Sequence, residues 1–235
     1  MERDAVVQSV FTPVRAPTTF EETVERLGTA IRTGILPAGS RLPAERTLAD
    51  ELEISRSTLR QAITTLVQSG LLISLRGRAG GTFVTESPPL APAGGPLLGE
   101  DAWAVLDYRV AIETGATMLA GERADADALD RLDALVERML DVDHFEDYRR
   151  ADIRFHVGLA EAARSPRLVS AMTEVQGRMS ELITRLPHPP ELLTHANAQH
   201  GRLVRLLRER DAGRAVRLMR EHVEGTEHIL AGLLR

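Results

Sequence analysis

The chain has 235 residues, enough for two domains of ordinary size, and its 43% of hydrophobic residues is sufficient for packed cores. It contains no cysteine, which excludes disulfide bridges and thiolate metal sites. The formal net charge of −5 argues against a protein that coats nucleic acid indiscriminately.

The N-terminal segment lacks the features of a targeting signal or a packed element. Met1-Glu2-Arg3-Asp4 does not have the layout of a signal peptide, and residues 1–18 contain two prolines without sustained apolar periodicity. No uninterrupted apolar run in the chain approaches the length of a membrane span. We therefore expect a mobile arm over 1–18 and a cytoplasmic protein with no membrane partner.

The residues that follow predict two amphipathic helices. The first covers about 19–34, and its apolar face is formed by Val24, Leu27, Ile31 and Ile35. Pro43 suits the start of a second, shorter helix, in which apolar residues recur at helical spacing at Leu48, Ala49 and Leu52.

A longer helix is predicted from Arg56 to Ser69, with Ser55 as its N-cap and Gly70 after its end. Its buried stripe is formed by Leu59, Ala62, Ile63, Leu66 and Val67. The start of the opposite, polar face carries Arg56, Ser57, Thr58 and Arg60. Such residues suit contacts with base edges in the major groove, where arginine can pair with guanine or phosphate. The pattern favours a recognition helix, although a capped, solvated helix start uses the same residue types.

A basic hairpin is predicted next. Two short strands, over 71–75 and 82–84, are joined by the glycine-rich tip Arg76-Gly77-Arg78-Ala79-Gly80-Gly81. Such a tip can approach phosphates or the minor groove closely. Three helices followed by this hairpin predict a winged helix-turn-helix domain, an α+β fold, over 19–85.

Three segments of this domain, PAGSRLPAER, SRSTLRQAI and RGRAGGTFV, resemble the GntR family of bacterial transcription regulators in composition and order. The chain departs from the family pattern at Leu59, where valine is common, and by an extra small residue in the wing. The resemblance implies contacts to double-stranded DNA from the residues at matching positions, which are Arg46, Ser55, Arg56, Ser57, Thr58, Arg60 and Gly77.

Proline and glycine then separate this domain from a second one. The run Glu86-Ser87-Pro88-Pro89-Leu90-Ala91-Pro92-Ala93-Gly94-Gly95-Pro96 disfavours any continuous helix or strand, so a linker is expected over 86–101. After it, apolar periodicity near 3.6 predicts helices over about 102–122, 125–140, 145–163, 167–186, 191–209 and 212–234. The region 102–235 is therefore predicted to be an all-helical bundle.

Four polar residues of this bundle stand on faces that should point inward. Asp152 and His156 are four residues apart, on the side of their helix that carries Phe155 and Leu159. His200 continues one apolar stripe, and His222 continues another. Three imidazoles and a carboxylate would suit a divalent ion such as Zn²⁺, Ni²⁺ or Mn²⁺. A single inward histidine, by contrast, is more often a hydrogen-bonded core residue.

The helical region also resembles a known domain, through the segments RVAIETGATMLA, ADIRFH, HGRLVRLLRERD and AVRLMREHV. It is similar to the FCD ligand-binding domain of the FadR-like GntR subfamily. In metal-containing members an aspartate and three histidines hold the ion, at positions that match Asp152, His156, His200 and His222. The remaining histidines, at 144, 188, 195 and 228, lie off that pattern and are expected to be solvated.

Arg109 interrupts the apolar stripe of the first bundle helix, and an inward-pointing charge requires an anionic partner. Glu113, one helical turn away, is one such partner. The resemblance favours another, a small carboxylate effector that also coordinates the metal.

The resulting hypothesis is a homodimeric DNA-binding regulator, a repressor, that reads an inverted-repeat operator and responds to a carboxylate effector. A direct metal sensor and a regulator with a purely structural metal are the alternatives. A metal-dependent hydrolase is disfavoured, because no second general base is evident and a catalyst would not need a DNA-reading domain.

Overall fold

The computed structural model describes residues 11, 19–32, 34–77, 80–88, 100–142, 144–183 and 190–234. The chain forms two compact units, one of Met1–Gly99 with Gly225–Arg235 and the other of Glu100–Glu224. Most of the expected arm over 1–18 and of the expected linker over 86–101 lies outside the described residues. Phe11, the described residue of the arm, is buried.

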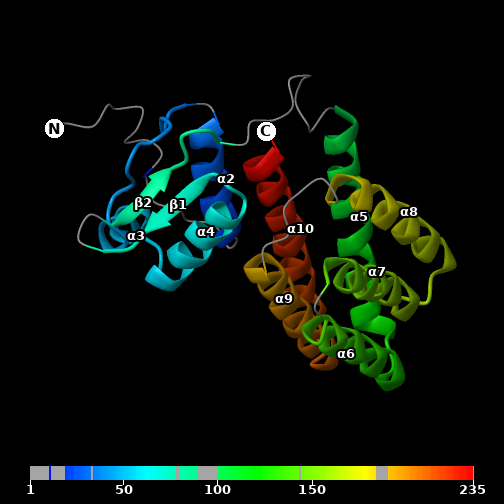
Figure 1. Cartoon of the computed structure of the whole chain (residues 1–235). Coiled ribbons are helices and arrows are strands. Elements are labelled where there is room, and N and C mark those ends of the chain that lie inside the picture. Colours follow the sequence, from blue (N-terminus) through cyan, green and yellow to red (C-terminus); the bar gives the residue numbers. More distant parts are fainter. Residues whose placement is uncertain are drawn as a thin grey trace. The chain divides into compact units, whose positions relative to one another are not determined.

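The first unit contains the predicted winged helix-turn-helix (Figure 1). Its elements are α2 (Thr19–Arg32), α3 (Glu45–Leu52), α4 (Arg56–Gln68), β1 (Leu72–Leu75) and β2 (Gly81–Val84). Helix α2 ends before the predicted position 34, where Gly34 has a left-handed φ of 75°. Helix α4 packs against α2, α3 and β1, so one apolar core fixes the orientation of its polar face.

The turn between α3 and α4 is defined by local chemistry. Glu53 follows α3 in the left-handed conformation, with φ 54°. The Ser55 side chain then accepts a hydrogen bond from the Thr58 backbone N–H at 3.0 Å, as predicted for an N-cap. Leu52 and Leu59, on either side of the turn, are fully buried, which holds the two helices together.

Strands β1 and β2 form the predicted hairpin. They pair antiparallel, with Leu72 opposite Val84 and Leu75 opposite Gly81. Arg41, which precedes α3, forms an isolated bridge with Phe83. This bridge ties the wing to the segment ahead of α3.

The second unit confirms the predicted all-helical architecture. Its helices are α5 (Glu100–Arg123), α6 (Ala126–Leu140), α7 (Phe145–Ala162), α8 (Pro166–Ile183), α9 (Pro190–Arg208) and α10 (Ala212–Leu234), the last of which continues beyond this unit. Asp125 and Asp211 cap α6 and α10 by accepting backbone hydrogen bonds at 2.8 and 2.9 Å. Helix α7 packs against α5, α6 and α8 (Figure 1), which makes it the central helix of the domain.

None of the helices in the described part of the chain combines the length and the apolar character needed to cross a membrane.

Candidate functional site

The polar start of α4 is accessible. Ser55, Arg56, Ser57 and Arg60 are exposed and Thr58 is half-buried, whereas Leu59 between them is fully buried. Arg46, near the start of α3, is also exposed. The apolar stripe of α4 therefore presents Ser55, Arg56, Ser57 and Arg60 on the side away from the core.

Arg60 has a partner that the sequence did not predict. Its Nη2 and Nε atoms donate to Glu45 Oε2 at 3.0 and 3.3 Å, and both side chains are exposed. Because the two residues lie on different helices, no helical spacing could have indicated this pair. A base or phosphate would have to compete with Glu45 for the Arg60 guanidinium.

The described part of the wing tip is accessible as well. Gly77 is exposed and has a φ of 102°, a conformation that favours glycine. Arg41 donates from Nη2 to the Gly80 carbonyl at 2.6 Å, and its guanidinium lies 5.7 Å from the centroid of the Phe83 ring. Arg41 therefore adds a basic side chain at the wing that sequence reasoning missed.

Three of the four proposed metal ligands converge closely inside the helical unit. His156 of α7, His200 of α9 and His222 of α10 are all buried, and one ring nitrogen of each lies within 4.8 Å of the others. The Nε2 atoms of His200 and His222 are 3.3 Å apart. Helical spacing placed each residue on an inward face, and the structure brings these faces together.

Asp152 lies at the edge of this histidine cluster. Its Oδ1 is 3.8 Å from His156 Nε2 and 3.7 Å from His200 Nε2. Its Oδ2 accepts a hydrogen bond from Arg149, one helical turn earlier on α7. Asp152 therefore directs Oδ1 at the imidazoles of His156 and His200, while Oδ2 binds the guanidinium of Arg149.

The outer partners of the histidines suit metal binding through Nε2. Glu113 Oε2 lies 2.8 Å from His156 Nδ1, and Gln199 Oε1 lies 2.8 Å from His222 Nδ1. An oxygen at Nδ1 favours a proton there, which leaves the Nε2 lone pair directed at the cluster. Within the described chain, both ring nitrogens of His156 are buried without a hydrogen-bond partner, so the contact of Nδ1 with Glu113 is an electrostatic one. An orphaned buried nitrogen among two further imidazoles and a carboxylate fits a divalent cation.

Burial also keeps two of these imidazoles neutral. It lowers the pKa of His200 to about 3, against the opposing effect of Asp152. Burial and then the neighbouring His200 hold the pKa of His222 well below its ordinary value. Only neutral imidazole can bind a metal ion, so both side chains are in the state that ligation requires.

Arg109 is part of a buried polar network next to the cluster. Its Nε donates to Glu113 Oε1 at 2.7 Å, and Gln176 Nε2 donates to the same oxygen at 2.8 Å. Burial raises the pKa of Glu113, but Arg109 and His156 outweigh it and hold the pKa well below the usual range. Arg109 Nη1 is buried without an acceptor in the described chain. Glu113 therefore connects Arg109 to His156, a role that sequence reasoning did not foresee.

The remaining histidines differ among themselves. His144 is exposed as expected, whereas His195 is half-buried and position 188 lies outside the described residues. The expectation that His228 is solvated is wrong, because its Nδ1 is in hydrogen-bond contact with Glu25 of α2 and the side chain is half-buried. This partner is about two hundred positions away in the sequence, where no periodicity could indicate it.

Known protein families match both the winged helix-turn-helix region and the helical region of this chain. The FCD domain model matches residues 104–225, and the model of bacterial regulatory proteins of the gntR family matches residues 19–84. "Putative HTH-type transcriptional regulator RmpR" of Mycobacterium gastri is 34% identical over 216 residues, which cover 85% of this chain and 76% of that protein. "Putative L-lactate dehydrogenase operon regulatory protein" of Escherichia coli (strain K12) is 30% identical over 206 residues, which cover 82% and 78%.

The solved structure of E. coli McbR/YncC has the same fold. It matches with a TM-score of 0.52 and 21% identity, over 90% of this chain and 96% of that one. The two family matches and the two relatives identify a regulator of transcription and not an enzyme. The chain belongs to the gntR family of bacterial regulatory proteins, in the FadR-like subfamily whose second domain is an FCD domain.

Proposed function

We propose that this protein is a repressor whose affinity for its operator is controlled by a small carboxylate effector, bound at a divalent metal ion in the helical domain. The observation that carries the proposal is the buried cluster of His156, His200 and His222, with Asp152 at its edge. In this proposal 1–18 is an arm, 19–85 binds DNA, 86–101 is a linker, and 102–235 binds effector and dimerises.

Charge balance supports a negatively charged ligand at the ion. The buried charged groups around the histidines are two arginines, Arg109 and Arg149, and two carboxylates, Glu113 and Asp152, which cancel. A divalent ion would add two positive charges in a region of low dielectric constant, where an uncompensated charge is costly. A carboxylate bound to the ion, with Arg109 Nη1 as a further donor, would offset part of that excess.

The named residues would have different roles in binding the metal ion and the effector. Asp152 and the three histidines would hold Zn²⁺, Ni²⁺ or Mn²⁺, and the ion when bound supplies a Lewis-acid anchor for an oxygen ligand. Glu113 and Gln199 orient two imidazoles from outside. The E. coli relative is named for an L-lactate dehydrogenase operon, which is consistent with a small organic acid as the effector of this protein.

The effector proposal is tested by thermal unfolding of the metal-loaded protein against a panel of small carboxylic acids. A ligand that binds the folded state raises the midpoint, and that rise should disappear in His222→Ala. Glu137→Gln, an exposed carboxylate of α6 outside the cluster, is the control and should keep the rise. A panel without any stabilising acid would contradict the proposal.

The DNA-binding proposal rests on the exposed start of α4. Arg46, Arg56 and Arg60, with the hydroxyl side chains of Ser55, Ser57 and Thr58 and the wing at Gly77, would contact DNA. Two copies related by a twofold axis would read the two halves of an inverted repeat. A footprint without inverted symmetry, or a monomer at working concentration, would contradict this part.

A direct metal sensor is the second candidate, and one observation favours it. Arg109 already has Glu113 as a counter-ion, so the buried network does not require an organic acid for its own balance. In a metal sensor, removal and return of the ion would switch operator affinity without any acid. In the effector proposal, metal alone would leave operator affinity nearly unchanged.

A further inference from the structure

Helix α9 with the residue that follows it, and helix α10, carry similar eight-residue segments. Residues 202–209 read RLVRLLRE and residues 214–221 read RAVRLMRE, so the two segments agree at six positions. In each copy, the two leading arginines, the following leucine and the glutamate are spaced i, i+3, i+4 and i+7. This spacing places them on one side of a helix.

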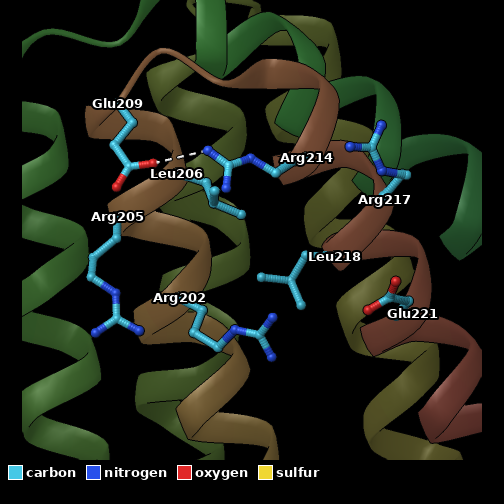
Figure 2. Close-up of a pocket in the computed structure, with 8 residues that line it drawn as sticks. All are labelled: Arg202, Arg205, Leu206, Glu209, Arg214, Arg217, Leu218 and Glu221. Carbon is cyan, nitrogen blue, oxygen red and sulfur yellow. Dashed lines mark hydrogen bonds and ion pairs between the residues drawn. The ribbon is translucent and has the colours of Figure 1, made fainter. Parts of the chain in front are cut away.

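The two copies face a common groove (Figure 2). Only Glu209–Asp211 separate α9 from α10, so the helices run antiparallel and the end of one repeat lies beside the start of the other. Accordingly, Arg214 Nη2 lies 3.4 Å from Glu209 Oε2. The groove has a volume of about 370 Å³, with Leu206 and Leu218 between the arginines.

The groove has an excess of positive charge that its own residues do not neutralise. Four arginines and two glutamates line it, and Asp211, which binds Arg214, brings the net charge to +1. Arg214 is bound by Glu209 and Asp211. Among the described residues, no carboxylate lies within ion-pair distance of the other three, Arg202, Arg205 and Arg217.

The third arginine of each repeat, Arg208 or Arg220, differs from the second arginine, Arg205 or Arg217. It does not line the groove, and in both copies it has a carboxylate partner. Arg208 binds Asp130 and Asp133, each at 2.6 Å, and Arg220 binds Glu224 at 2.6 Å. Acidic partners therefore accompany the third arginine of each repeat but not the second, Arg205 or Arg217.

We propose that the groove between α9 and α10 is a second ligand site, separate from the histidine cluster, that binds the phosphate group of a small molecule. Arg205 and Arg217 are exposed side chains that Figure 2 shows directed away from each other, and they would turn toward the phosphate from the two helices. The planar guanidinium matches phosphate oxygens in pairs. A phosphate would supply the anionic partner that Arg202, Arg205 and Arg217 lack among the described residues. A second copy of the same groove would bring like charges together, which disfavours self-association through this surface.

Calorimetric titration of the full chain at constant ionic strength tests the site with inorganic phosphate, glucose 6-phosphate and glucose. Both phosphates should bind and glucose should not. The double variant Arg205→Gln/Arg217→Gln should weaken phosphate binding at least about tenfold, the effect of losing roughly 1.4 kcal/mol of charge-assisted contacts. Arg150→Gln/Arg220→Gln removes the same charge from exposed positions outside the groove and should leave binding unchanged.

The same titrations distinguish two sources of the phosphate group. Some of their outcomes would also overturn the proposal. Tighter binding of glucose 6-phosphate would indicate a phosphorylated metabolite, whereas equal binding would indicate free phosphate. Absence of phosphate binding, or equal weakening in both double variants, would overturn the site. A change in oligomeric mass confined to Arg205→Gln/Arg217→Gln, measured by sedimentation with phosphate binding intact, would also overturn it and indicate an interface.

Discussion

At the scale of single residues, Arg109 shows how a buried charge is retained in an apolar helix face. It ion-pairs with Glu113, which in turn is within 2.8 Å of both His156 Nδ1 and Gln176 Nε2. Each member reduces the cost of burying the others, because an isolated charge in the interior would be far less stable. With Nδ1 of His156 at Glu113, the other ring nitrogen, Nε2, is on the side of the histidine cluster.

Removing Arg109 should destabilise the helical domain more than ordinary truncation of a surface arginine. In Arg109→Met, Glu113 loses its counter-ion, and breaking a buried ion pair from one side costs roughly 3–5 kcal/mol. Denaturant unfolding of the metal-free protein measures this loss. Arg109→Met/Glu113→Gln should recover part of the stability, because the uncompensated carboxylate is gone. A loss in the single variant below about 1 kcal/mol would contradict a structural role for the pair.

Arg60 is the residue whose change should alter DNA binding most directly. Arg60→Ala should weaken operator binding by about 1–3 kcal/mol and relax the preference at one base pair. Binding to the operator and to its single-base variants measures both effects. Arg167→Ala, an exposed arginine of α8, makes the same charge change away from α4 and should have little effect. Undiminished affinity in Arg60→Ala would remove this residue from the DNA-binding surface.

At the scale of elements, the start of α4 depends on one side chain. The Ser55 hydroxyl accepts from the Thr58 N–H, a donor that would otherwise have no partner within the helix. Ser55→Ala should therefore destabilise the first turn of α4 by about 1 kcal/mol, whereas Ser55→Asn should preserve the cap. Hydrogen exchange of the first-turn amides measures the local effect. Equal protection in all three proteins would mean that packing alone holds the helix start.

The last turns of α10 and helix α2 belong to the same compact unit, and their contact should respond to pH. The hydrogen bond with Glu25 is the main cause that raises the pKa of His228 above 6.5, while partial burial opposes it and Glu227 and Glu22 add to the rise. Because the folded pKa is raised, protonated His228 stabilises the fold below about pH 6.5. That contribution is lost as the pH rises through the higher folded value.

The midpoint of thermal unfolding, measured from pH 5.5 to above neutral pH, is compared between the wild type and His228→Gln. The midpoint of the wild type should exceed that of the variant at pH 5.5, and the difference should shrink above neutral pH. A difference that is constant with pH would show that the imidazole contributes by packing and not by charge.

At the scale of the whole molecule, effector control requires coupling between two sites. If an effector lowers operator affinity by a given factor, the operator must lower effector affinity by the same factor, because both belong to one thermodynamic cycle. Fluorescence titrations of the metal-loaded protein, with effector in the presence and absence of operator and the reverse, measure the two factors. Unequal factors at equilibrium would indicate a linked process outside this scheme, such as a change in oligomeric state.

The helices of both domains were predictable because their signals are local. Apolar spacing, the caps at Ser55 and Asp211, and the glycine-rich hairpin each concern residues within one or two turns of the chain. The same local rules placed His156, His200 and His222 on inward faces. Where prediction failed at His228, its partner Glu25 lies on another helix, at a separation that no local pattern encodes.

Local patterns in the amino-acid sequence were enough to predict the fold class, the family resemblance and the side of each helix on which a candidate site residue stands. The packed structure was needed to show which of those sides meet. It brings three imidazoles within reach of one ion, places Glu113 between Arg109 and His156, and pairs Glu45 with Arg60. The physical reason is that helix geometry follows from neighbouring residues, whereas distances between helices follow from how all their side chains pack at once.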